Sequence, residues 1–173
     1  MIDLDYKSLD RTIAGLTEGL VFITKGLAEL MIPYCESPIE IILGVSLLGV
    51  DRLAFLDDTT LRFVTPEKAK CVSEKARVLI PQYEWEGRRI DWLLRDPPFN
   101  VFIECDGHDF HERTKEQAAR DRRKDREVQS SGCPILRFTG SEIFSDPLGC
   151  GFEICKFVEK KKIQAGLRKE QPQ

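Results

Sequence analysis

Three carboxylates and the only two histidines of the chain lie in one short stretch. Asp91 belongs to one apolar run, Glu104 and Asp106 belong to the next, and His108 and His111 follow almost immediately. Carboxylate oxygens bind hard divalent cations, and imidazole exchanges a proton near neutral pH. Acidic residues clustered with histidine at the end of a strand are typical of a hydrolytic site.

A β-hairpin is predicted to position these groups. Two apolar runs, residues 88–95 and 99–106, flank a turn that contains two adjacent prolines. Closure between the prolines pairs positions whose numbers sum to 195, so Asp91 lies opposite Glu104. Directly opposed Cβ atoms are about 5 Å apart, where like charges destabilise the sheet. A divalent cation between the two side chains would convert that cost into a metal site.

A second interpretation of the hairpin is also open. The same register places Arg89 opposite Asp106, where it could neutralise that carboxylate. The polar residues would then form an ordinary solvated face, with the core on the alternate side of the strands. The residues expected on that core side are Ile90, Trp92, Leu94, Val101, Ile103 and Cys105.

Composition indicates one globular domain. The 173 residues are 42% hydrophobic and 32% charged, and the net charge of −3 argues against general coating of nucleic acid. The six cysteines include no C-x-x-C pair, so buried free thiols, as expected at Cys105 and Cys133, are favoured over disulfides. No leader pattern opens the chain and no run approaches the ~20 apolar residues of a membrane span. We expect an intracellular, cytoplasmic and reducing environment without membrane contact.

The first 35 residues are predicted to form a helical extension. Apolar residues recur at alternating three- and four-residue steps over residues 8–31, which is the spacing of a coiled-coil seam. This seam is either packed on its own domain or used in a homodimer. It consists of Ile13, Leu16, Leu20, Ile23, Leu27 and Leu30.

A second, buried helix is predicted to begin at Ser37. Ser37, Pro38 and Glu40 match a capping box with proline at the first helical position. The run to about Leu53 is apolar around most of its circumference, which indicates a central position. Glu40 has a sufficient structural role as the capping partner, and a second role near a metal site is possible.

The rest of the domain is predicted as strands with two further helices. A short strand at 61–64 precedes a strand at 78–85, which joins the hairpin in an antiparallel meander. A strand at 134–138 is expected to lie parallel to 99–106 after a helical crossover. A final helix at 151–162 should pack inward through Phe152, Cys155 and Val158. The domain spans residues 36–163, and residues 164–173 form a flexible tail.

The crossover helix, about Thr114 to Ser131, carries an excess of positive charge in a chain that is otherwise negative. One interpretation is a solvated face with interspersed acids, and the other is a track for the phosphate backbone of DNA. The residues of that track that would bind nucleic acid are Lys115, Arg120, Arg122 and Arg123.

These motifs, in this order, resemble the PD-(D/E)xK nuclease superfamily. Within it, the chain is similar to uncharacterised proteins that are like the very-short-patch mismatch-repair endonuclease. The resemblance covers roughly residues 36–145. It is carried by Ser37-Pro38-Ile39-Glu40, Ile90-Asp91-Trp92, Glu104-Cys105-Asp106-Gly107-His108 with His111, Asp121-Arg122-Arg123-Lys124-Asp125, and Ile135-Leu136-Arg137-Phe138 after Gly132.

The resemblance implies an α/β fold with a restriction-endonuclease-like core. That core is αβββαβ, with a mixed four-stranded sheet flanked by helices, here preceded by the extra N-terminal helix. It also implies a divalent-metal-dependent endonuclease acting on DNA. Asp91 and Glu104, with the Cys105 carbonyl, would hold Mg²⁺ or Mn²⁺. His108 or His111 could act as general base or proton shuttle, or could hydrogen-bond the phosphate.

One departure concerns Asp106, which occupies the place where the superfamily name expects lysine. This leaves the group that activates water or stabilises charge unassigned, and Asp106 could instead orient a histidine or hold a second ion. The chief alternative is a catalytically inactive module of the same fold that binds nucleic acid or a protein partner. A third is a structural protein that self-associates through the 8–31 seam.

Overall fold

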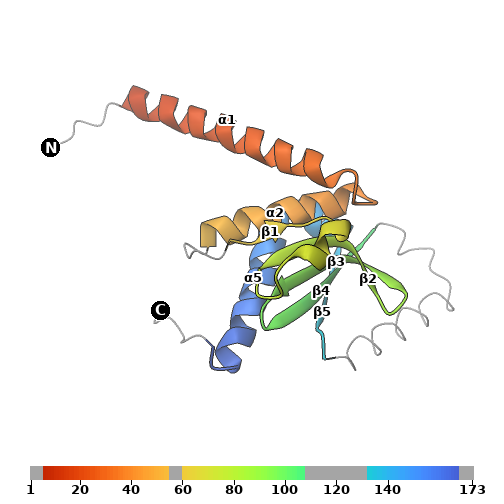
Figure 1. Ribbon diagram of the computed structural model, residues 1–173. Helices are drawn as coiled ribbons and strands as arrows, with labels where there is room; N and C mark the ends of the chain where they lie inside the picture. The colour runs from red at the N-terminus through yellow and green to blue at the C-terminus, as the bar shows by residue number, and fades with distance from the viewer. Residues whose placement is uncertain (1–5, 55–59, 108–131, 168–173) are drawn as a thin grey trace.

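The computed structural model describes residues 6–54, 60–107 and 132–167, and shows an α/β fold (Figure 1). In the described residues the α-helices come at the two ends of the element order and the strands come between them. In chain order they are α1 (Tyr6–Met31), α2 (Pro38–Ala54), β1 (Arg62–Phe63), the 3₁₀ helix η1 (Pro66–Cys71), β2 (Val78–Trp85), β3 (Arg88–Asp96), β4 (Phe99–Asp106), β5 (Ile135–Thr139), α4 (Gly140–Ser145) and α5 (Pro147–Gln164).

The sheet is mixed, in the order β1-β2-β3-β4-β5. Strands β2, β3 and β4 form the predicted antiparallel meander, and β5 lies parallel to β4 as expected from a crossover. The expectation of four strands was wrong by one, because the short strand β1 pairs in parallel with β2 at Arg62–Val78 and Phe63–Leu79. The segment at 61–64 is therefore part of the sheet edge.

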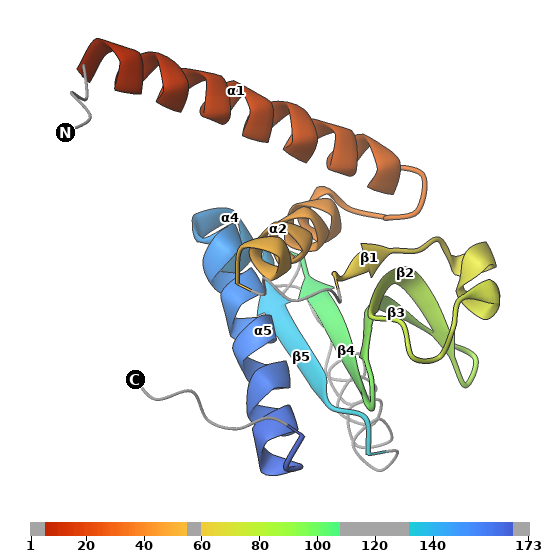
Figure 2. The same ribbon diagram turned by 60° about the vertical axis from the view of Figure 1, so that its left-hand side comes forward.

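Helices α2, α4 and α5 cover one face of the sheet (Figure 2). The main core lies between them, with Trp92 fully buried and its ring against α2 at Gly44. A Cβ atom at Gly44 would lie 2.6 Å from Cζ2 of Trp92, so only glycine admits the indole at this distance. The all-round apolar sequence of α2 is thus explained by burial against the sheet and α5.

The opposite face of the sheet also buries apolar side chains, so the expectation of a single core side was wrong. Ile90 does not join Trp92 and Leu94 in the main core but belongs to a second cluster. The alternation of β3 is therefore interrupted between Ile90 and Trp92. The second cluster consists of Val78, Ile80, Ile90, Leu93 and Phe102.

Helix α1 extends away from the rest of the fold along most of its length (Figure 2). Near its C-terminal end Leu27 and Met31 pack into the main core, whereas Leu20 and Ile23 are 62% and 51% exposed. Of the seam residues whose side chains the structure describes, Leu27 packs on the domain, whereas Leu20, Ile23 and Leu30 are exposed. Within the described ranges no helix is apolar over a length sufficient to cross a bilayer.

The C-terminal helices differ from their prediction in extent. Thr139 and Glu142 form a reciprocal capping box that begins the unpredicted helix α4. Helix α5 begins four residues earlier than expected, because Asp146 caps it through the Gly149 amide. Cys155 and Val158 face inward as predicted, but Phe152 is 41% exposed and was predicted wrongly.

Candidate functional site

The hairpin register is the one expected from the sequence. The pairs between β3 and β4 run from Asp96–Phe99 to Trp92–Ile103, and in each of them the residue numbers sum to 195. The ladder ends there, one step before Asp91 and Glu104 would pair. Oδ2 of Asp91 instead accepts a 2.7 Å hydrogen bond from the backbone nitrogen of Cys105. Asp91 is therefore held against β4 by a side-chain contact at the point where strand pairing stops.

Glu104 and Asp106 lie on β4 beside Arg137 of β5. Both carboxylate residues are buried, at 8% and 9% exposure. Nη1 of Arg137 lies 3.9 Å from Oε2 of Glu104 and 3.4 Å from Oδ1 of Asp106. The expectation that Arg89 faces Asp106 across the hairpin was wrong, since the ladder ends before that pair and Arg89 forms a 2.6 Å ion pair with Glu36.

Glu40 lies at the start of α2 and is almost fully buried. Its Oε1 accepts from the Ser37 hydroxyl at 2.7 Å, and its Oε2 accepts from the Glu36 amide at 3.0 Å. The predicted structural role at the helix start is therefore real, although the amide it binds is that of Glu36. Nε2 of Gln82 also donates to Oε2 at 2.8 Å and joins α2 to β2.

Gln82 is a residue of this site that the sequence interpretation missed. It has φ 47°, a left-handed conformation that is costly for a non-glycine residue inside a strand. The β2–β3 ladder pairs Pro81 with Trp92 and Tyr83 with Ile90, so the distortion lies across from Asp91. A proline inside a predicted strand indicates such an irregularity and could have drawn attention to this position.

Negative charge converges on the Cys105 thiol. Burial raises the pKa of Cys105, and the carboxylates of Asp91, Glu40 and Glu104 raise it further. Burial, Glu40 and Asp91 likewise raise the pKa of Cys35 to about 12. Both thiols are therefore protonated at neutral pH. The carboxylates of Asp91 and Glu40 act on both thiols. The start of α2, β3 and β4 are therefore close enough to interact electrostatically.

The oxygens at this site suit a hard cation better than a soft one. Mg²⁺ is commonly held by one or two carboxylates together with retained waters, so Asp91 and Glu104 are the residues that could hold it. In the described part of the chain, no three His, Cys, Asp or Glu side chains are grouped as a metal cage. A role for the Cys105 carbonyl stays a prediction.

Several predicted site residues lie outside the described residues. They are the two histidines and the basic residues of the crossover helix, namely His108, His111, Lys115, Arg120, Arg122 and Arg123. Their roles as general base and as phosphate contacts therefore stay predictions.

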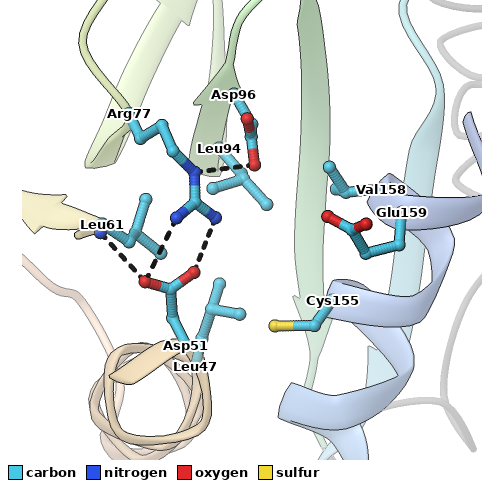
Figure 3. Close-up of a pocket in the computed structure, with 9 residues that line it drawn as sticks. All are labelled: Leu47, Asp51, Leu61, Arg77, Leu94, Asp96, Cys155, Val158 and Glu159. Atoms are coloured by element: carbon cyan, nitrogen blue, oxygen red, sulfur yellow. Dashed lines mark hydrogen bonds and ion pairs between the residues drawn. The ribbon is translucent and has the colours of Figure 1, made fainter. Parts of the chain in front are cut away.

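A second polar cluster, which the sequence did not indicate, lies between α2, α5 and the sheet (Figure 3). Arg77 bonds Asp51 at 2.6 Å and Asp96 at 2.9 Å, and Lys162 lies 2.7 Å from Asp96. Burial alone would lower the pKa of Arg77, but the two carboxylates outweigh it and raise that pKa. The adjoining cavity of ≈ 10 Å³ has room for about one water molecule. This cluster is a structural ion network that joins three elements.

A wider groove of ≈ 790 Å³ lies between η1 and strands β2 and β3. Its charged lining is mixed, since Lys70 and Arg95 are accompanied by Glu67, Glu84 and Glu86. Such a lining does not favour the phosphate backbone of nucleic acid. The site at the end of β4 is the stronger candidate for chemistry.

Comparison of the chain with protein-family models, with curated proteins and with solved structures found no match.

Proposed function

We propose that this protein is a divalent-metal-dependent nuclease that hydrolyses phosphodiester bonds in DNA as an endonuclease. The observation that carries the proposal is the hydrogen bond that holds Asp91 of β3 against β4, at the residue next to Glu104. The carboxylates of Asp91, Glu40 and Glu104 act together on the Cys105 thiol. Carboxylate pairs at a strand end are the usual protein contribution to metal-assisted phosphoryl chemistry.

Asp91 and Glu104 would hold Mg²⁺ or Mn²⁺. When bound, the ion polarises the scissile phosphate and lowers the pKa of a coordinated water. Asp91 is kept in place by the Cys105 amide, and Glu104 by its position in the β4–β5 ladder. The hydrogen bond from Gln82 to Glu40 joins β2 to the start of α2. His108 or His111 would take the proton released by the attacking water.

DNA would be bound through its phosphates. The basic side chains of Lys115, Arg120, Arg122 and Arg123 follow the acidic site in the sequence. Contacts of this kind position a duplex without reading its bases, and they make affinity depend on salt.

The test is cleavage of supercoiled plasmid, with single-stranded DNA and RNA as parallel substrates, in Mg²⁺ or Mn²⁺. Wild-type protein should nick or linearise the plasmid, and chelator should stop it. Asp91→Asn and Glu104→Gln should abolish cleavage while retaining the fold. Glu74→Ala, at an exposed acid away from the site, is the matched control and should cleave normally. Cleavage by Asp91→Asn at the wild-type rate would overturn the proposal.

A catalytically inactive nuclease-fold module is the second candidate. It is favoured by the structural contacts that two of the acids make, Asp91 with the Cys105 amide and Asp106 with Arg137. Such a module would bind nucleic acid or a protein partner without metal. Metal-independent affinity for DNA with no cleavage of any substrate would support it against the enzyme.

A further inference from the structure

Arg137 of β5 is a basic group that lies beside the acids of β4. It pairs with Glu104 in the parallel β4–β5 ladder, and Thr139 pairs with Asp106. Its Nη1 reaches both carboxylates, at 3.9 Å and 3.4 Å. Its side chain is 27% exposed, so the guanidinium lies at the boundary between the buried acids and solvent.

The neighbours of Arg137 explain why its side chain takes this direction. Leu136 and Phe138 pack into the main core, and Ile135 packs into the cluster on the other face. Alternation along β5 therefore directs Arg137 to the face that carries Glu104 and Asp106. Because the two flanking residues are anchored in the core, the guanidinium is held beside the acids with little freedom to move along the strand.

We propose that Arg137 supplies the positive charge that β4 lacks at the candidate site. This inference rests on the proposed nuclease function. Asp106 occupies the position where a lysine would be expected, so β4 offers two acids and no cation there. Arg137 reaches the same place from the adjacent strand, and Asp106 holds it there through the 3.4 Å ion pair.

The chemistry of arginine suits this role. A guanidinium remains charged at every pH at which the protein is folded, and its parallel N–H groups match two phosphate oxygens. In hydrolysis, the water oxygen bonds to phosphorus and the bond to the leaving oxygen breaks. The proton of the water passes to the base, and the leaving oxygen takes up a proton from solvent. Arg137 neither gains nor loses a proton, and it stabilises the negative charge that develops on the phosphate oxygens.

This role predicts opposite effects on catalysis and on metal binding. Removing the guanidinium should slow the chemical step, because a donor to the transition state is lost. It should not weaken metal binding, because the carboxylates of Glu104 and Asp106 lose a competing cation. A merely structural Arg137 would instead weaken metal binding when removed, since its loss would disorder the acids.

The test compares wild type, Arg137→Met, Arg137→Lys and the control Arg62→Met, an exposed arginine on β1. Single-turnover cleavage, DNA affinity in Ca²⁺ and Mn²⁺ binding by electron paramagnetic resonance are measured for each. Arg137→Met should cleave about 10²- to 10³-fold more slowly. Its DNA affinity should change less than about tenfold. Its Mn²⁺ affinity should equal or exceed that of wild type, and Arg137→Lys should recover part of the rate.

The outcomes separate this inference from the proposed function. If wild type and Arg137→Met cleave at similar rates, the role of Arg137 is overturned and the nuclease stands. If Arg137→Met and Arg137→Lys both unfold or both lose Mn²⁺, Arg137 is a structural residue and the inference is again overturned. If wild type cleaves no substrate, the proposed function itself fails.

Discussion

Oδ2 of Asp91 lies 2.7 Å from the backbone nitrogen of Cys105 and accepts its hydrogen bond. The contact forms where the β3–β4 ladder ends, so a side chain replaces the missing strand pairing. The same carboxylate also raises the pKa of the Cys105 thiol. Asp91 is therefore both a structural acceptor and a source of charge, and the two roles can be separated by substitution.

Asp91→Ala should destabilise the fold by about 1–3 kcal/mol, because it leaves the Cys105 amide without its acceptor. Asp91→Asn keeps an acceptor oxygen and should cost less. Both variants remove the charge and should weaken Mn²⁺ binding alike. Urea denaturation and Mn²⁺ titration check the two effects. An equal loss of stability in both variants would show that charge, and not the hydrogen bond, holds this corner together.

Two glycines of α2 should respond to alanine in opposite ways. Gly44→Ala places a Cβ atom 2.6 Å from the Trp92 ring and should destabilise by about 1–3 kcal/mol. A Cβ atom at Gly49 would meet nothing within 4 Å, so Gly49→Ala should stabilise the helix by up to about 1 kcal/mol. Thermal unfolding of the two variants measures the difference. Similar shifts would mean that α2 does not approach β3 at Gly44.

Substitution of Arg77 should lower the free energy of unfolding more than most single substitutions. Arg77→Met leaves Asp51, which also accepts from the Leu61 amide, and Asp96 buried without their guanidinium partner. Breaking one side of a buried ion network costs about 3–5 kcal/mol. The exposed Arg62→Met should change stability by less than about 0.5 kcal/mol. Urea denaturation of both variants is the measurement, and a small effect of Arg77→Met would show that the network contributes little.

Alkaline pH should weaken the fold through thiols that are buried or half-buried. Burial is the main cause that raises the pKa of Cys35 and of Cys155 to about 12, and that of Cys133 to about 11, from 9.0. Between pH 9.0 and the raised pKa values, these thiols keep their protons in the folded chain and release them in the unfolded chain. The stability that the protonated thiols contribute is therefore fully present below pH 9 and is lost as pH rises toward 12. Urea denaturation across this range should show the decline.

Thiol labelling gives an independent check of the same environments. Cys71 is exposed, whereas Cys150 and Cys155 are buried. At pH 8 an alkylating reagent should modify Cys71 first, because access and thiolate character both control the rate. Mass spectrometry of partly labelled protein identifies the site. Uniform labelling of all three cysteines would contradict the packing described.

Helix α1 should mediate self-association if the seam of one copy packs against the seam of a second copy. Leu20 and Ile23 belong to the seam and are exposed, whereas Phe22, at 78% exposure, lies outside it. Leu20→Glu combined with Ile23→Glu should shift a dimer to monomer, and Phe22→Glu should not. Light scattering after size exclusion measures the mass. A wild-type monomer at all concentrations would show that the seam serves another purpose.

Local pattern was enough to predict much of the fold. The register of β3 and β4 followed from two apolar runs and a proline turn, because a shift of one residue would exchange the faces of both strands. The bounds of α2 followed from Ser37, Pro38 and the apolar run behind them. The parallel placement of β5 followed from the crossover, which has few geometric alternatives.

Several features of the site depended on contacts between residues distant in sequence. Gln82 has a left-handed backbone, and on the paired strand Ile90 faces the second cluster. A pattern of alternating apolar residues does not predict this change of face. Arg77 joins Asp51 of α2 and Asp96 of β3 in one network.

The sequence by itself determined which acids the hairpin carries and how β3 and β4 align, because strand pairing and alternation act over neighbouring residues. Only the tertiary structure decided that Asp91 bonds the Cys105 amide and that Arg137 lies beside Glu104 and Asp106. The physical reason is that those contacts depend on where a ladder ends and on which strand becomes the neighbour. Both are properties of the assembled sheet.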